Sequence, residues 1–228
     1  MVNNKVCVIV GGADVICAYS AKEMAKNGYV TAIVDTNIDN AKRIADEICT
    51  FGGLAKAYEG NCYDYDSLSN VRRLIYAEFG KCNVIVNNLK GDLDGEAAMD
   101  CALLSAKVFI REMSDESGCC VVNICPSGEL ETAAEELSRK MAVNLADSGV
   151  RVNAIIYKNI IARSNKSEFY NDDNTPTESA QTMLEAIPMG RFGRPEEVVG
   201  ALKYLSDPMA ASYTTGAVIR VDGGYSAR

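Results

Sequence analysis

The chain has 228 residues, of which 48% are hydrophobic and 24% charged, as in an ordinary globular protein. Its net charge of −8 comes without any run of Lys or Arg, which argues against binding to nucleic acid. The chain contains no histidine, so mechanisms that use an imidazole base, including the Ser-His-Asp and Cys-His types, are excluded.

Short apolar segments alternate with longer helical segments along the chain. Strands are predicted at 5–10, 29–35, 54–58, 83–86, 119–124, 150–156 and 217–221. Helices are predicted at 16–27, 37–51, 64–79, 95–113, 129–147 and 195–205. Asp64 is expected to cap the third helix, and Gly28 to follow the first. The polar stretch 164–177 is typical of a surface loop.

Apolar strands that alternate with helices are typical of a parallel sheet covered on both faces. The order predicts an α/β protein with a Rossmann-type, doubly wound, mostly parallel sheet. The length fits a single domain that spans 1–228.

The nine cysteines are scattered through apolar segments and form no CxxC pair. We expect reduced, buried thiols and no metal, because clustered thiolates or imidazoles with zinc-binding spacing are absent. Residues 1–10 lack the features of a signal peptide, and no segment is long enough to span a bilayer. These features predict a cytoplasmic protein without membrane contact.

Several motifs agree in order and spacing with one known family. PMGRFGRPEE at 188–197, YTTG at 213–216 and VDGG at 221–224 resemble the closing signature of the short-chain dehydrogenase/reductase family. GVRVNA at 149–154 resembles the strand before its substrate loop, and residues 84–88 resemble the strand at its Asn-Asn-Ala-Gly motif.

The resemblance covers nearly the whole chain, and segments 11–17, 61–68 and 188–197 are most similar to the D-mannonate oxidoreductase (fructuronate reductase) branch. It implies oxidoreductase activity with a nicotinamide cofactor. In such folds a glycine-rich turn and the following helix N-terminus hold the pyrophosphate. The likeness implies this role for Gly11, at the first glycine position, and for Ile16, at the start of the helix.

The turn departs from the family pattern. Val15 and Cys17 replace the second and third glycines, and Asp14 stands where the mannonate-like branch keeps a glycine. A carboxylate about 5 Å from a phosphate, at an effective dielectric of about 20, is repelled by roughly 3 kcal/mol. That repulsion weakens pyrophosphate binding about a hundredfold.

The adenosine end keeps more of the pattern. An acid such as Asp35, at the end of the second strand, bonds ribose hydroxyls and repels a 2′-phosphate, so the expected cofactor, if one binds, is NAD. The alternative is that Asp35 only caps the next turn. The likeness implies that Asn61 and Cys62 lie beside the adenine. It also implies that Asn87 corresponds to the family's asparagine that supports the fourth strand.

The family's Asn-Ser-Tyr-Lys catalytic set falls on other residue types. Its Tyr aligns with Ser127 and its Lys with Glu131, while its Ser aligns with 125–126 and its Asn with Ala98. A serine hydroxyl has a far higher pKa than a phenol, and Glu131 reverses the charge that would lower such a pKa. We therefore predict that the chain carries no catalytic residue of the family type.

The segments expected beside the nicotinamide also differ. The family's Pro-Gly pair is Tyr157-Lys158 here, and its Ala-Gly pair is Leu89-Lys90. Tyr157 and Lys158 as a new acid/base pair are disfavoured, because neighbours in an extended segment point to opposite sides. Whether Lys90 or Tyr157 fills the site stays open.

Two functions are compatible with this pattern. The first is a family member that has lost its catalytic set, lacks dehydrogenase activity and serves as a binding or structural subunit. The second is an NAD-dependent oxidoreductase that acts on a sugar acid, such as D-mannonate or fructuronate, with a rearranged site. Both allow a small-molecule ligand.

Two of the predicted helices are expected to contact other copies of the chain. The helix at 95–113 is apolar around most of its circumference. The helix at 129–147 carries an apolar residue at every fourth position, namely Ala133, Leu137, Met141 and Leu145. In the family the matching helices pack against their copies, so we expect a homo-oligomer, a dimer or a tetramer. The alternative is that both helices only cover the sheet.

Overall fold

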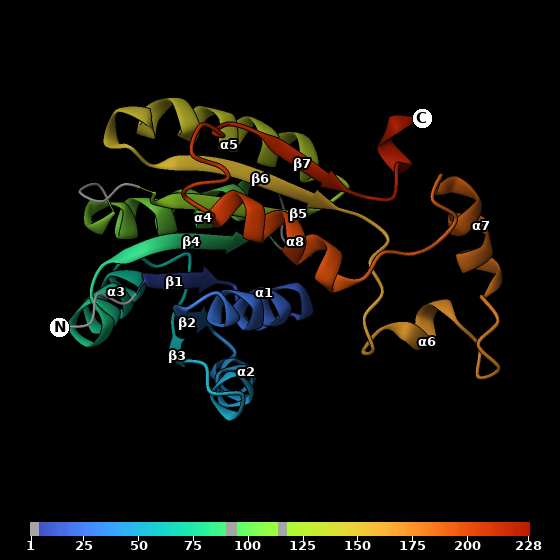
Figure 1. Ribbon diagram of the computed structural model, residues 1–228, viewed down its shortest axis with the longest axis horizontal. Helices are drawn as coiled ribbons and strands as arrows, with labels where there is room; N and C mark the ends of the chain where they lie inside the picture. Colours follow the sequence, from blue (N-terminus) through green and yellow to red (C-terminus); the bar gives the residue numbers. More distant parts are fainter. Residues whose placement is uncertain (1–4, 90–94, 114–117) are drawn as a thin grey trace.

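The computed structural model describes residues 5–89, 95–113 and 118–228 (Figure 1). Within these residues, one parallel sheet has the strand order β3-β2-β1-β4-β5-β6-β7. The strands are β1 (Lys5–Val10), β2 (Tyr29–Asp35), β3 (Ala55–Glu59), β4 (Cys82–Asn88), β5 (Cys120–Pro126), β6 (Arg151–Tyr157) and β7 (Val218–Val221). The order reverses between β1 and β4, which confirms the predicted doubly wound Rossmann-type fold.

Helices cover both faces of the sheet (Figure 1). One face carries α1 (Val15–Lys26), α2 (Ile38–Thr50) and α8 (Pro195–Ser206), and the other carries α3 (Tyr65–Phe79), α4 (Gly95–Phe109) and α5 (Glu131–Leu145). Side chains of β1 alternate between the two: Val6 and Val8 pack towards α3–α5, and Cys7 packs towards α1, α2 and α8. Burial on both faces explains why the inner strands are mostly apolar, whereas the edge strand β3 carries exposed Lys56 and Glu59.

Local signals in the sequence fix several helix ends. Asp64 accepts hydrogen bonds from the amides of Asp66 and Ser67, so it caps α3 as predicted. Gly28 follows α1 with a φ of +83°, a conformation that favours glycine. Short 3₁₀ turns, η1 (Ile110–Glu112) and η2 (Ala146–Ser148), extend α4 and α5, and η3 (Tyr225–Ala227) lies near the C-terminus.

The segment after β6 contains two helices that the sequence did not predict. A short helix, α6 (Lys166–Phe169), interrupts the predicted loop, and α7 (Glu178–Ala186) follows it. Both lie beyond the carboxyl ends of the strands (Figure 1). They pack in a small apolar cluster of their own around Phe192, separate from the main core, which explains the weak sequence signal. No helix in the described part of the chain is long and apolar enough to cross a membrane.

All nine cysteines lie in the described residues, and two of them correct the prediction of reduced thiols. Cys62 and Cys101 form a disulfide. Cys49 is a free thiol but is exposed, and the remaining six are free and buried. The disulfide pair is 39 residues apart in the chain, and only the packing of α4 beside the loop after β3 brings its Cα atoms to 5.0 Å. Sequence spacing alone could not have identified the pair.

Candidate functional site

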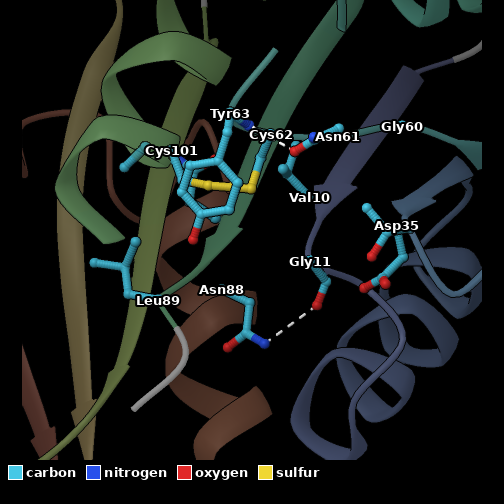
Figure 2. Close-up of a pocket in the computed structure, with 13 residues that line it drawn as sticks. Val10, Gly11, Asp35, Gly60, Asn61, Cys62, Tyr63, Asn88, Leu89 and Cys101 are labelled. Atoms are coloured by element: carbon cyan, nitrogen blue, oxygen red, sulfur yellow. Dashed lines mark hydrogen bonds between the residues drawn. A yellow bond between two sulfur atoms is a disulfide. The ribbon is translucent and has the colours of Figure 1, made fainter. Parts of the chain in front are cut away.

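A cavity of about 170 Å³ opens at the carboxyl ends of β1, β2 and β4 (Figure 2). We call it the nucleoside pocket. Five of the six residues predicted to contact a cofactor line it: Gly11, Asp35, Asn61, Cys62 and Asn87. They meet because the carboxyl ends of parallel strands share one edge, beside the point where the strand order reverses. The sixth residue, Ile16, lies outside this pocket.

Asp35 faces the pocket from the end of β2 and is buried. Its Oδ2 accepts from the amide of Ala13 at 3.0 Å, and its Oδ1 accepts from the amide of Asn37 at 2.9 Å. It therefore does cap the next turn, as the alternative interpretation held, while still lining the cavity. A carboxylate has about four acceptor positions and can accept several hydrogen bonds at once, so Asp35 is of the chemical type that binds ligand hydroxyls.

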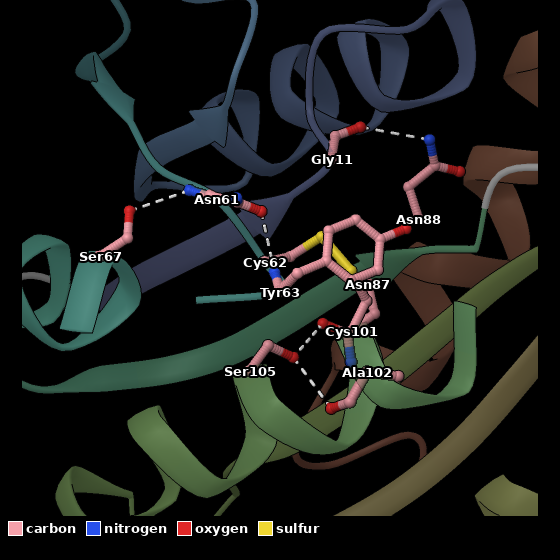
Figure 3. Close-up of a disulfide and its surroundings, with 10 residues drawn as sticks. All are labelled: Gly11, Asn61, Cys62, Tyr63, Ser67, Asn87, Asn88, Cys101, Ala102 and Ser105. Carbon is pink, nitrogen blue, oxygen red and sulfur yellow. Dashed lines mark hydrogen bonds between the residues drawn. A yellow bond between two sulfur atoms is a disulfide. The ribbon is translucent and has the colours of Figure 1, made fainter. Parts of the chain in front are cut away.

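The loop after β3 forms the opposite wall of the pocket (Figure 3). The side-chain oxygen of Asn61 accepts a hydrogen bond from the backbone amide of Tyr63 at 3.0 Å. The backbone amide of Asn61 donates to the Ser67 hydroxyl at 3.0 Å, and the two bonds fix the turn. The Cys62–Cys101 disulfide ties this turn to α4. Tyr63 and Cys101, which sequence reasoning missed as pocket residues, complete an apolar wall of the kind that receives a ring system.

Asn87 lines the pocket, but its side chain is engaged inside the protein. It is 2% exposed, donates to Asn123 at 2.9 Å and accepts from Ser105. Asn123 in turn donates to Ser138 on α5 at 2.9 Å. This buried chain of polar groups joins β4 and β5 to α4 and α5, so Asn87 supports the frame of the pocket.

Asp14 and Asn88 meet across the cleft. Asp14 caps α1, because its Oδ1 accepts from the amide of Cys17 at 2.8 Å. Its Oδ2 accepts from Nδ2 of Asn88, and the same nitrogen donates to the carbonyl of Gly11 at 3.1 Å. We call this contact the Asp14–Asn88 bridge. Sequence reasoning identified Asp14 but did not name Asn88 as a site residue, although Asn88 lies in the segment that resembles the family's Asn-Asn-Ala-Gly motif at the end of β4.

A second cavity, of about 230 Å³, lies near the start of α1. Asp14, Ile16 and Tyr157 line it, so Ile16 is separated from the other predicted cofactor residues. Burial raises the pKa of Tyr157 well above its usual range, and the charge of Asp14 raises it further. Lys158 lines a different cavity, with its ammonium 3.9 Å from the centre of the Tyr225 ring. Tyr157 and Lys158 thus line separate cavities, which agrees with the expectation that they do not act as a pair.

Ser127 and Glu131, the positions predicted to correspond to the family's Tyr and Lys, form a closed polar network. The Ser127 hydroxyl donates to Oε2 of Glu131 at 2.6 Å. Oε1 of Glu131 accepts from Arg220 on β7, which also pairs with Glu135. The Glu131 carboxylate is thus engaged on both sides.

The remaining aligned positions are apolar or protonated. Ala98 is buried on α4. Burial raises the pKa of the Cys125 thiol to about 12, so it stays protonated at neutral pH. Leu89 is buried as well, while Lys90 lies outside the described residues.

Family models match the chain along nearly its whole length. One described as short chain dehydrogenase matches residues 5–128, and one described as enoyl-(acyl carrier protein) reductase matches residues 128–226. The chain belongs to the short chain dehydrogenase family. This agrees with the fold and with the motifs that suggested the family.

The relatives span the chain at low identity. An uncharacterized oxidoreductase of Haemophilus influenzae is 28% identical over 267 residues, covering 98% of this chain and 94% of the relative. The uncharacterized oxidoreductase UxuB of Bacillus subtilis is 26% identical, with coverages of 98% and 95%. Both alignments are longer than the chain, so they contain gaps in it, in keeping with shortened loops.

Solved structures support the same relationship. A Haemophilus influenzae protein with bound NAD, provisionally named a D-mannonate oxidoreductase, matches with a TM-score of 0.88 at 28% identity, covering 99% of this chain and 96% of its own. A hydroxysteroid dehydrogenase from Escherichia coli matches with a TM-score of 0.82 at 27% identity, covering 96% of each chain.

The residues of this chain fit only part of such a dinucleotide. The nucleoside pocket has a carboxylate placed for ribose hydroxyls and an apolar wall for a base. The α1 N-terminus, which holds the pyrophosphate in folds of this type, carries the Asp14 carboxylate and the Asp14–Asn88 bridge. The adenosine half fits, and the pyrophosphate does not.

Proposed function

We propose that this chain is a binding protein on a short-chain dehydrogenase fold, which holds an adenosine-containing ligand and does not transfer hydride. The observation that carries the proposal is the network of Ser127, Glu131 and Arg220. In the family these positions supply a phenol and the lysine that lowers its pKa. A carboxylate held between a hydroxyl and a guanidinium offers neither group, so no proton relay of that kind can form.

Tyr157 does not replace the missing phenol. Its pKa is raised, so at neutral pH it keeps its proton and is a poor general base. Lys158, which could lower that pKa, lies over Tyr225 instead. A bound NAD would supply hydride chemistry, but the side chains described around it lack a matched acid or base.

A turnover assay tests the proposal. Purified protein is mixed with NAD or NADH and with D-mannonate, D-fructuronate or a 7-hydroxysteroid, and the nicotinamide absorbance is followed. We expect wild type and the Tyr157→Phe variant to give the same background. The proposal would be overturned if the wild type showed turnover and the Tyr157→Phe variant did not.

That outcome would favour the second candidate, an NAD-dependent oxidoreductase of a sugar acid. The observation behind this candidate is the NAD-bound relative from Haemophilus influenzae, which is provisionally named for D-mannonate. Titration calorimetry with NAD and adenosine, done on the same preparation, separates failure of binding from failure of catalysis.

We also propose that the chain forms at least a dimer through α4 and α5. Leu137, Met141 and Leu145, three of the four residues in the stripe predicted to contact a partner, pack instead in or against this chain's own core. Leu103 on α4 and Val143 on α5 are exposed apolar side chains available to a second copy. Sedimentation equilibrium is expected to give a dimer or tetramer, and a monomer alone would refute the proposal. The cytoplasmic location stays a prediction.

A further inference from the structure

The Asp14–Asn88 bridge divides the cleft in two. Asp14 belongs to the cavity that also holds Tyr157, and Asn88 belongs to the nucleoside pocket. Nδ2 of Asn88 reaches from the end of β4 to Gly11 and Asp14 at the start of α1. A dinucleotide in this fold crosses from one side to the other at this point, with its phosphates on the α1 amides.

The bridge opposes phosphate by both position and charge. Oδ1 of Asp14 already accepts from the amide of Cys17, one of the donors in the first turn of α1. A phosphate brought to the same turn would need to displace that oxygen and would face a like charge. At about 5 Å and a dielectric of about 20, this repulsion lowers the affinity for a phosphorylated ligand about a hundredfold.

The nucleoside pocket itself offers acceptors. Oδ1 of Asn88 is buried and accepts no hydrogen bond from any described residue, and Asn88 as a whole is only 8% exposed. A buried acceptor without a partner is costly, so a ligand donor at this place gains affinity. Asp35 adds a carboxylate on the same pocket. Acceptors of this kind suit hydroxyl and amine groups and do not suit phosphate oxygens, which are acceptors themselves.

The size of the pocket agrees with a small ligand. Its volume of about 170 Å³ is below the roughly 300–1,000 Å³ typical of sites for drug-sized ligands. Its wall combines the disulfide and Tyr63 with the acceptors opposite (Figures 2 and 3). A planar base against the apolar wall would leave its sugar near Asp35.

We propose that the pocket binds a nucleoside without a 5′-phosphate, such as adenosine, and that the Asp14–Asn88 bridge excludes its phosphorylated forms. The proposal rests on the proposed function, since it names the ligand class of the same site. In this proposal Asp14 determines the specificity for unphosphorylated over phosphorylated ligands, at the helix N-terminus where folds of this type usually bind a phosphate.

The test is titration calorimetry with adenosine, ADP and NAD. Wild type is expected to bind adenosine at least about tenfold more tightly than ADP or NAD, because each phosphate meets Asp14. Asp14→Gly should raise the affinity for ADP and NAD about a hundredfold relative to the affinity for adenosine. Asp35→Asn should weaken adenosine about tenfold or more, which places the ligand in this pocket.

Two further variants separate charge from shape and from folding. Asp14→Asn keeps a side chain that can cap α1, so it removes the charge without opening the turn. Asp39→Asn makes the same change of charge on an exposed residue at the start of α2, outside the pocket, and should leave all affinities unchanged. Circular dichroism verifies that each variant is folded.

The outcomes are distinct. NAD binding to wild type as tightly as adenosine, or Asp14 variants that leave the ADP affinity unchanged, would overturn this inference. Tight NAD binding without turnover would overturn the exclusion of phosphorylated ligands but would agree with the proposed absence of hydride transfer. Wild type that binds neither adenosine nor NAD would overturn both this inference and the proposed binding function.

Discussion

Breaking the Cys62–Cys101 disulfide should destabilise the protein by a measurable amount. The crosslink joins residues 39 apart, the turn after β3 and the α4 helix. In the chain-entropy model, a closed loop of about 39 residues lowers the unfolded-state entropy enough to stabilise the fold by about 4 kcal/mol at 25 °C. Typical domains are stable by only about 5–15 kcal/mol, so this is a large share.

Urea unfolding of the Cys101→Ser variant measures the effect. We expect a free energy of unfolding about 2–4 kcal/mol below wild type, and a similar loss when wild type is reduced by a phosphine. Cys49→Ser is the matched control, because Cys49 is an exposed free thiol outside the disulfide, and it should unfold like wild type.

A thiol titration makes the same test independent of stability. The unfolded but unreduced protein should show seven free thiols, and the reduced protein nine. Nine thiols without reduction, or equal stability of the oxidised and reduced protein, would refute the reasoning. Loss of the crosslink should also weaken adenosine binding, because Cys62 and Cys101 both line the nucleoside pocket.

Three further predictions follow from single groups. In the folded protein iodoacetamide should modify Cys49 first, because Cys49 is exposed whereas burial raises the pKa of Cys125 to about 12. Mass spectrometry that finds Cys125 modified equally fast would contradict this prediction. Arg220→Ala should lower the free energy of unfolding in urea by about 1 kcal/mol, since it removes the cation beside Glu131 and leaves Glu135 with Arg139 alone; an unchanged midpoint would mean that the Arg220 pairs contribute nothing. The Arg191 guanidinium holds the pKa of Glu197 at about 2, down from 4.5. The ionised Glu197 therefore stabilises the fold above about pH 4.5, and this stabilisation is lost as the pH falls towards 2. Glu197→Gln should flatten the pH dependence of the free energy of unfolding between these two values.

Which parts of the fold were predictable depends on how local their signals are. The strands were found because burial on both faces requires apolar residues at every position, as in β1. The cap at Asp64 and the turn at Gly28 were found because their chemistry involves only neighbours in the chain. The helix α7 was missed because only a small apolar cluster around Phe192 holds it, which leaves little periodicity in the sequence.

The sequence by itself determined the family and the sheet, and it supplied the prediction that Ser127 and Glu131 stand at the catalytic positions. Only the tertiary structure decided what those side chains do. It showed that Cys62 is crosslinked to Cys101 and that Asp14 bonds to Asn88, partners that lie 39 and 74 residues apart. Such contacts depend on how strands and helices pack, and a distance along the chain carries no information about them. The physical reason is that secondary structure follows local patterns, whereas a site is assembled from the ends of elements that meet in space.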